Sequence, residues 1–140
     1  MGWTDSHLHL FRIQDNEYGM LDEDGDNGDL FDERDFTLGE LISSGRFQYQ
    51  YDFGDEWEHA LEIEQTLPSD AIIRYPVCNA GELACPPEDV GGISGYKDFL
   101  KAVKNPRHPD HKHYREWIGG DFDPEAFDLN AVNQLLRALR

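Results

Sequence analysis

Two cysteines could do chemistry in a segment that is otherwise rich in proline and glycine. Cys78 and Cys85 have six residues between them, and Pro86-Pro87-Glu88-Asp89 follows directly. Thiolates bind zinc, although this spacing is not the C-x-x-C of zinc fingers or thioredoxin-like sites. His59, on a predicted neighbouring strand, is the candidate third ligand, and Glu88 or an open position would complete a tetrahedron. His59, Cys78 and Cys85 are therefore the candidate ligands of a metal site, for which zinc is the candidate ion.

The same two cysteines fit two other interpretations. Two buried structural thiols, the interpretation that we favour over a metal site, need no ion. A reversible disulfide would close a short loop. A disulfide is the least expected of the three in the reducing interior of a cell. These alternatives stay open at the level of sequence.

A second cluster of chemical groups lies at residues 51–59, YDFGDEWEH. Paired carboxylates such as Asp52 and Asp55 can bind a divalent cation or share a proton. The alternative, which we favour, is a hairpin turn in which both side chains accept hydrogen bonds from backbone amides. Trp57 belongs to the same cluster and is included among the candidate site residues, as are Glu88 and Asp89.

His7-Leu8-His9 places two imidazoles on one face of a predicted strand, a geometry that zinc enzymes use. His7 is therefore a further site candidate. The sequence contains no G-x-S-x-G elbow, P-loop, dinucleotide fingerprint or H-E-x-x-H pair. No nucleophile can be assigned from the sequence.

The elements that must position these groups begin with strands. Residues 6–13 alternate in character, and so do residues 47–53, whose aromatic side chains all share one face. Residues 57–67 alternate again after the turn signal Gly54-Asp55, so a β-hairpin is predicted. A short helix is predicted over 36–42, with the spacing of Thr37 and Glu40 typical of a capping box.

Helices are predicted in the second half of the chain. Residues 68–95 are irregular and longer than an ordinary connection. Apolar side chains recur at helical spacing over 96–103, a second short helix is predicted over 110–118, and Asp128 caps a final one. Strands precede helices, so we predict an α+β fold with an antiparallel-rich sheet and with the C-terminal helices packed on it.

Length and composition bound the class of protein. The 140 residues suit one domain, 1–140, and the acidic stretch 15–35 is predicted to be a mobile loop within it. The apolar runs are far shorter than the roughly 20 residues of a membrane-spanning helix, and no secretory signal opens the chain. With only two cysteines, a cytoplasmic protein without a membrane partner is expected.

Charge is unevenly distributed along the chain, whose net charge is −17. Residues 15–40 carry eleven acidic side chains and one basic one, whereas residues 97–115 carry six basic and two acidic ones. Duplex DNA repels an acidic surface, so non-specific DNA binding is not expected. The acidic stretch could instead occupy the nucleic-acid site of another protein.

The order of the motifs resembles that of the plasmid pRiA4b ORF-3-like family over essentially the whole chain. The motifs are G-W-T-D-S-H-L-H-L-F at 2–11, Y-D-F-G-D-x-W-x-H at 51–59, C-x₆-C-P-P-E-D-V-G-G-x-x-G-Y at 78–96 and F-D-P-E-x-F-D at 122–128. The resemblance implies an α+β domain of prokaryotic type, found on plasmids, near mobile elements and in chromosomes. It implies no established activity.

One departure from the family bears on assembly. Members that resemble this chain usually carry a strand and a helix before the Gly2-Trp3 motif, whereas this sequence begins at Met1. A sheet without that strand exposes an edge, and an exposed edge favours pairing with a second copy. We therefore expect a homodimer formed through a sheet edge.

Three functions follow from these observations. The first is a small acidic binding module whose site combines the Cys78–Cys85 loop, His59 and the acidic turn. The alternative is a metal-dependent hydrolase or nuclease-like enzyme that uses Asp52, Asp55 and His59 around a divalent ion. The third is an acidic decoy that binds a nucleic-acid-binding partner through residues 15–40.

Overall fold

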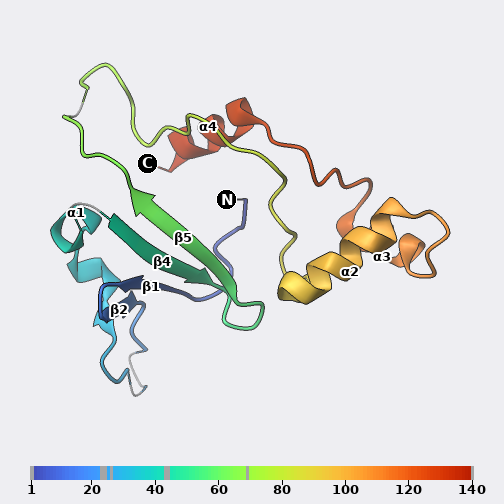
Figure 1. Ribbon diagram of the computed structural model, residues 1–140, viewed down its shortest axis with the longest axis horizontal. Coiled ribbons are helices and arrows are strands. Elements are labelled where there is room, and N and C mark those ends of the chain that lie inside the picture. The colour runs from blue at the N-terminus through green and yellow to red at the C-terminus, as the bar shows by residue number, and fades with distance from the viewer. Residues whose placement is uncertain (1, 23–24, 26, 43–44, 69, 140) are drawn as a thin grey trace. The chain divides into compact units, whose positions relative to one another are not determined.

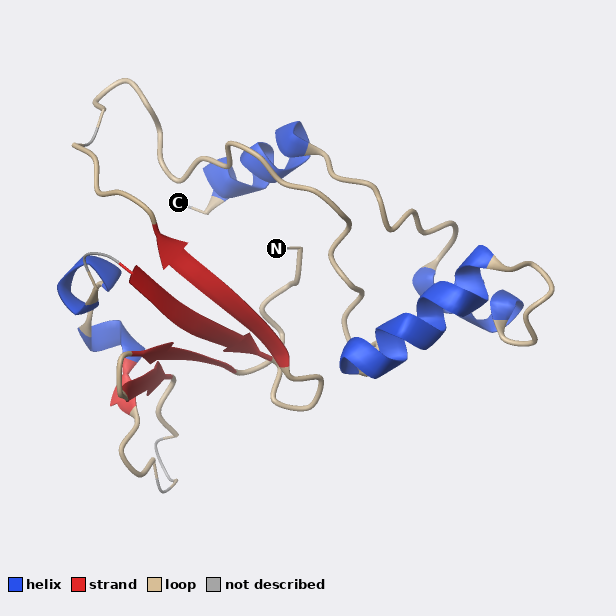
Figure 2. Cartoon of the chain, viewed as in Figure 1, coloured by secondary structure: helices blue, strands red, loops and turns tan. Residues whose placement is uncertain are grey.

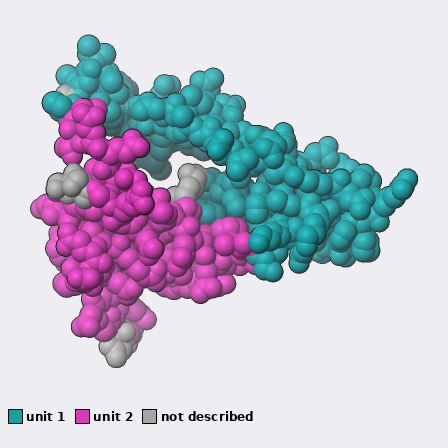
Figure 3. All heavy atoms as spheres, in the orientation of Figure 1, with its two compact units in different colours: residues 1–3, 68–90, 94–140 teal, residues 4–67, 91–93 magenta. Residues whose placement is uncertain are grey.

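The computed structural model describes residues 2–22, 25, 27–42, 45–68 and 70–139. Its contacts divide the chain into two compact units, coloured separately in Figure 3. We call them the sheet unit, Thr4–Leu67 with Gly91–Ile93, and the helical unit, Met1–Trp3 with Pro68–Val90 and Ser94–Arg140. Strands precede the long helices along the chain, so the predicted α+β class is confirmed (Figure 2).

The sheet unit contains a five-stranded sheet in the order β3-β2-β1-β4-β5 (Figure 1). Its strands are β1 (His9–Ile13), β2 (Asn16–Gly19), β3 (Phe31–Asp32), β4 (Gly45–Tyr51) and β5 (Trp57–Ile63). All neighbours are antiparallel except β2 and β3. The predicted hairpin is confirmed as β4 and β5, with Tyr49 opposite His59. Strand β4 ends at Tyr51, two residues earlier than predicted, because Asp52 adopts a left-handed backbone with a φ of 58°.

The two faces of this sheet differ in chemistry. A hydrophobic core lies on one face, where Ile13, Tyr18, Ile42 and Phe47 are buried together. On the other face, Arg12 donates hydrogen bonds to Glu17 and Gln50 at 2.9 and 2.8 Å. The period-2 alternation of the sequence therefore sorts apolar side chains from polar ones.

A short helix, α1 (Leu38–Leu41), precedes β4. The Glu40 carboxylate accepts the Thr37 backbone N–H at 2.8 Å and the Thr37 hydroxyl at 2.7 Å. The hydrogen bonds to Thr37 hold the pKa of Glu40 below its ordinary value. The capping box predicted from the sequence is thus confirmed.

The acidic stretch 15–35, predicted to be a loop, contains regular structure. It includes β2, β3 and the 3-10 helix η1 (Glu33–Asp35). The buried Tyr18 ring stacks on Phe31 with the ring centroids 5.4 Å apart. This apolar contact holds the stretch in place although most of its residues are polar or charged. Residues 23, 24 and 26 lie outside the described residues, and the mobility of the loop stays a prediction.

Three helices follow the sheet in the chain: α2 (Gly92–Lys104), α3 (His111–Ile118) and α4 (Leu129–Ala138). In the helical unit Phe99 is fully buried, with the rings of Tyr114 and Phe122 at 5.4 and 5.1 Å. The Asp128 carboxylate accepts the backbone N–H groups of Asn130 and Ala131 in the first turn of α4, as its predicted capping role requires. Among the described residues, no helix combines the length and the apolar character that crossing a membrane requires.

Candidate functional site

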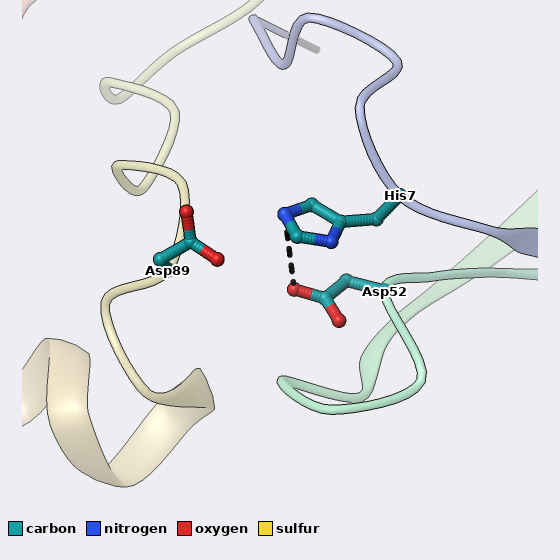
Figure 4. A group of neighbouring side chains, drawn as sticks. All are labelled: His7, Asp52 and Asp89. Atoms are coloured by element: carbon teal, nitrogen blue, oxygen red, sulfur yellow. Dashed lines mark ion pairs between the residues drawn. The ribbon is translucent and has the colours of Figure 1, made fainter.

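The sheet unit brings His7 and Asp52 together. His7 stands just before β1 and Asp52 just after β4, and these neighbouring antiparallel strands meet at this end with His9 opposite Tyr51. The Asp52 N–H extends the pairing by donating to the Leu8 carbonyl at 2.9 Å. The His7 ring and the Asp52 carboxylate therefore face each other, with Nε2 and Oδ2 3.8 Å apart (Figure 4).

Asp52 also shapes the hairpin turn. Its Oδ1 atom accepts the backbone N–H groups of Gly54 and Asp55 at 2.9 and 3.3 Å, and its carbonyl accepts the Glu56 N–H at 2.7 Å. These bonds agree with the capping role that the sequence favoured for Asp52. They also fix the carboxylate so that Oδ2 points to His7. Side chains held on a left-handed backbone are frequent at functional sites.

Tyr51 supports His7, the other member of the His7–Asp52 pair. Its side chain is 2% exposed, and its ring meets the His7 ring edge-on at 5.9 Å. The Tyr51 hydroxyl accepts the Ser6 backbone N–H at 3.1 Å. The segment that carries His7 is therefore anchored beside the sheet before any ligand binds.

Asp55 has a structural role in the same unit. Its Oδ2 atom accepts the Gly91 N–H at 3.0 Å. A Cβ atom on Gly92 would lie 2.5 Å from the Asp55 carbonyl oxygen, and the φ of Gly92 is +63°. The Gly91-Gly92 pair therefore allows the backbone to approach the turn closely. Trp57 begins β5 opposite Tyr51.

The two cysteines are free thiols in the helical unit. The Asn133 side chain accepts the Cys78 N–H and donates to the Cys78 carbonyl, both at 2.9 Å. Burial raises the pKa of the Cys85 thiol, which disfavours the thiolate that binds metals. Among the described residues, neither cysteine belongs to a group of three metal-ligating side chains.

The remaining predicted residues divide between the units. His59 lies on β5, where its Nδ1 atom is 3.0 Å from the Tyr49 carbonyl oxygen. Glu88 and Asp89 lie in the helical unit, and Asp89 has a left-handed backbone with a φ of 56°. The predicted ligand set of His59, Cys78 and Cys85 draws on both units and stays a prediction.

The sequence did not predict the contact between His9 and Glu33. His9 Nε2 lies 3.0 and 2.9 Å from the two carboxylate oxygens of Glu33. These residues are 24 positions apart, and no motif links them. Recognition of the short strand β3 before Glu33 could have located the contact. The acidic residues around β3 obscure this strand in the sequence.

Comparison with known proteins identifies the family to which these motifs belong. A family model described as plasmid pRiA4b ORF-3-like protein matches residues 1–131. The chain belongs to this family. The description of the plasmid pRiA4b ORF-3-like family names no activity. The resemblance drawn from the motifs is thus confirmed.

Two similar proteins extend this result. The uncharacterized protein y4hQ of Sinorhizobium fredii is 39% identical over 137 residues, which make up 96% of this chain and 70% of that protein. The crystal structure of MM3350 from Methanosarcina mazei Go1, a protein of unknown function, is similar with a TM-score of 0.83 and 33% identity. That match covers 94% of this chain and 75% of MM3350, and it supports the same fold.

Proposed function

We propose that this member of the plasmid pRiA4b ORF-3-like family binds a divalent transition-metal ion, with His7 Nε2 and Asp52 Oδ2 as ligands. The observation that carries the proposal is the 3.8 Å between these atoms. Ligand atoms that each lie about 2.0–2.2 Å from a tetrahedral zinc ion are about 3.4 Å apart. A small inward movement of either side chain would therefore suffice.

The surroundings of the pair support metal binding over a simple ion pair. Asp52 Oδ1 is held by two backbone N–H groups, and the Tyr51 ring packs against His7. Such outer partners orient ligands and raise metal affinity. An imidazole with a carboxylate suits zinc, manganese, iron, cobalt or nickel better than calcium, which prefers oxygen alone.

The test is calorimetric titration of chelator-treated protein with Zn²⁺. His7→Gln and Asp52→Asn should each weaken one binding event at least about tenfold. Asn tolerates a left-handed backbone and keeps an oxygen for the turn, so Asp52→Asn removes little besides the charge. His113→Gln, at an exposed histidine of α3, is the matched control. Equal zinc affinity in all four proteins would refute the proposal.

Further variants test the ligands that the sequence nominated. Glu88→Gln and Asp89→Asn ask whether the Pro-Pro-Glu-Asp motif contributes to zinc binding. A Cys78→Ser, Cys85→Ser double variant tests the predicted set of His59, Cys78 and Cys85. Loss of zinc in that variant, with normal binding in His7→Gln, would favour the cysteine site over ours.

The two alternative functions stay predictions. In the hydrolase or nuclease-like interpretation, Asp52 and Asp55 share an ion, but each uses one carboxylate oxygen to accept backbone N–H groups. The acidic decoy would require binding through residues 15–40 that weakens steeply with added salt.

Homodimer formation is also part of the proposal. Strand β5 pairs with β4 and with no other described strand, so seven residues form an edge. Exposed edges of this length favour pairing with another chain. Light scattering should detect dimers at high protein concentration, and a monomer at every concentration would contradict this expectation.

A further inference from the structure

The Glu33 carboxylate determines which nitrogen of His9 carries the proton when the ring is neutral. Both carboxylate oxygens lie within 3.0 Å of Nε2, and the two side chains are 13% and 22% exposed. A lone pair on Nε2 would face a half-buried anion, so this nitrogen donates its N–H to Glu33. The lone pair of the neutral ring is therefore on Nδ1.

The His9 Nδ1 atom is buried and has no hydrogen-bond partner within the described part of the chain. A buried polar atom without a partner is rare in folded proteins and often marks the place of an ion or a water molecule. A carboxylate oxygen, Asp5 Oδ1, lies 3.7 Å from His9 Nδ1. This separation is close to the roughly 3.4 Å between two ligands of a tetrahedral zinc ion.

We propose that His9 Nδ1 and Asp5 Oδ1 bind a second divalent transition-metal ion, with Glu33 as a positioning residue. Ligating histidines commonly donate their other ring N–H to a carboxylate, which orients the ring and makes the ligand more basic. The His9–Glu33 contact has this arrangement. The Asp5 side chain is 80% exposed, so water can reach the ion and complete its coordination.

The local charge also favours a cation. Asp5 and Glu33 place two carboxylates around one imidazole. A divalent ion would balance this concentration of negative charge. The site shares no ligand with the His7–Asp52 pair, so each proposal can fail alone.

Nitrogen-15 NMR of the histidine rings, recorded as Zn²⁺ is added to chelator-treated protein, tests the assignment. Zinc should shift His9 at Nδ1 while Nε2 keeps its proton, whereas His7 should shift at Nε2. Asp5→Asn should weaken the His9 response at least about tenfold and leave the His7 response unchanged. Asp35→Asn, an exposed acid in the same 3-10 helix as Glu33, is the control.

The role of Glu33 has its own readout. Glu33→Gln keeps a hydrogen-bond partner but removes the charge, so it should weaken zinc binding at His9 by about tenfold and increase the population of the other tautomer. A His9 ring that stays protonated on both nitrogens throughout the titration would overturn the proposal. So would a response equally strong in wild type and Asp5→Asn.

Discussion

In the sheet unit, Tyr51 and Ile13 keep 2% and 3% of their surface exposed. They lie in β4 and β1, two strands that pair with each other residue by residue. In the helical unit, burial centres on Phe99 and Ala102, and the Cys78 loop is held by the side chain of Asn133. The sheet unit thus positions residues through backbone pairing. The helical unit positions them through a small aromatic cluster and individual side-chain hydrogen bonds.

This difference explains where candidate ligands meet. His9 is the first residue of β1, His7 precedes this strand, and Asp52 follows β4. The antiparallel pairing of β1 with β4 therefore brings the three residues to one end of the sheet. The cysteines lie in a stretch, 70–90, where the described chain forms neither helix nor strand. Their positions depend on contacts that are distant in sequence, such as the Ala84 N–H with the Pro124 carbonyl at 2.9 Å.

The largest expected effect comes from truncating one buried phenylalanine in each unit. Phe99→Ala and Phe47→Ala should each lower the free energy of unfolding by about 3–5 kcal/mol, since the side chains are 0% and 6% exposed. Hydrogen exchange should lose protection mainly in α2 and α3 for the first and in β1 and β4 for the second. Phe53→Ala, at 49% exposure, should cost under about 1 kcal/mol. A loss below about 1 kcal/mol in Phe99→Ala would show that the aromatic cluster does not hold the helical unit.

A pair of glycine substitutions compares close packing in one unit with open backbone in the other. Gly119→Ala should cost about 1–2 kcal/mol, because its φ is +82° but no atom lies within 4 Å of the new Cβ. Gly92→Ala should cost about 3 kcal/mol or more, because the left-handed strain is joined by a 2.5 Å approach to the Asp55 carbonyl oxygen. Denaturant unfolding measures both. Equal costs would mean that the turn readily shifts away from Gly92.

Asn133→Ala tests the hydrogen bonds that hold the cysteine loop. Loss of the two bonds to Cys78 should lower the free energy of unfolding by about 1–2 kcal/mol. Alkylation of Cys78 should become faster, whereas Cys85, whose pKa is raised by burial, should stay slow. Mass spectrometry gives both rates, and Asn130→Ala on the exposed face of α4 is the control. Unchanged Cys78 reactivity would contradict the proposed support.

Of these tests, the loss of a surface ion pair should differ least between the two units. Hydrogen bonds from Arg34 lower the pKa of Asp32 to about 2, and Lys101 lowers that of Asp98 in the helical unit. Since the ordinary Asp pKa is about 3.9, Asp32 stabilises the fold above about pH 4 and this contribution disappears as the pH falls through 2. Arg34→Gln should return the pKa of Asp32 toward about 3.9 in an NMR titration. An unchanged pKa would exclude Arg34 as the cause.

Local patterns in the sequence predicted most elements correctly. Alternating side chains located β1, β4 and β5, helical spacing located α2, and the Thr37–Glu40 pair located the start of α1. The pattern failed in the acidic stretch 15–35, where β2 and β3 are only four and two residues long. Such short strands carry too few alternations to stand out among the ten acidic residues of this stretch.

The sequence by itself determined the fold class, the family and the residue types available for metal binding. Only the tertiary structure decided which of these residues meet. His7 pairs with Asp52 across two strands, and His9 pairs with Glu33 across 24 residues of chain. The physical reason is that periodicity reports which face of its own element a side chain occupies, whereas a site forms where strands from separate segments come into register.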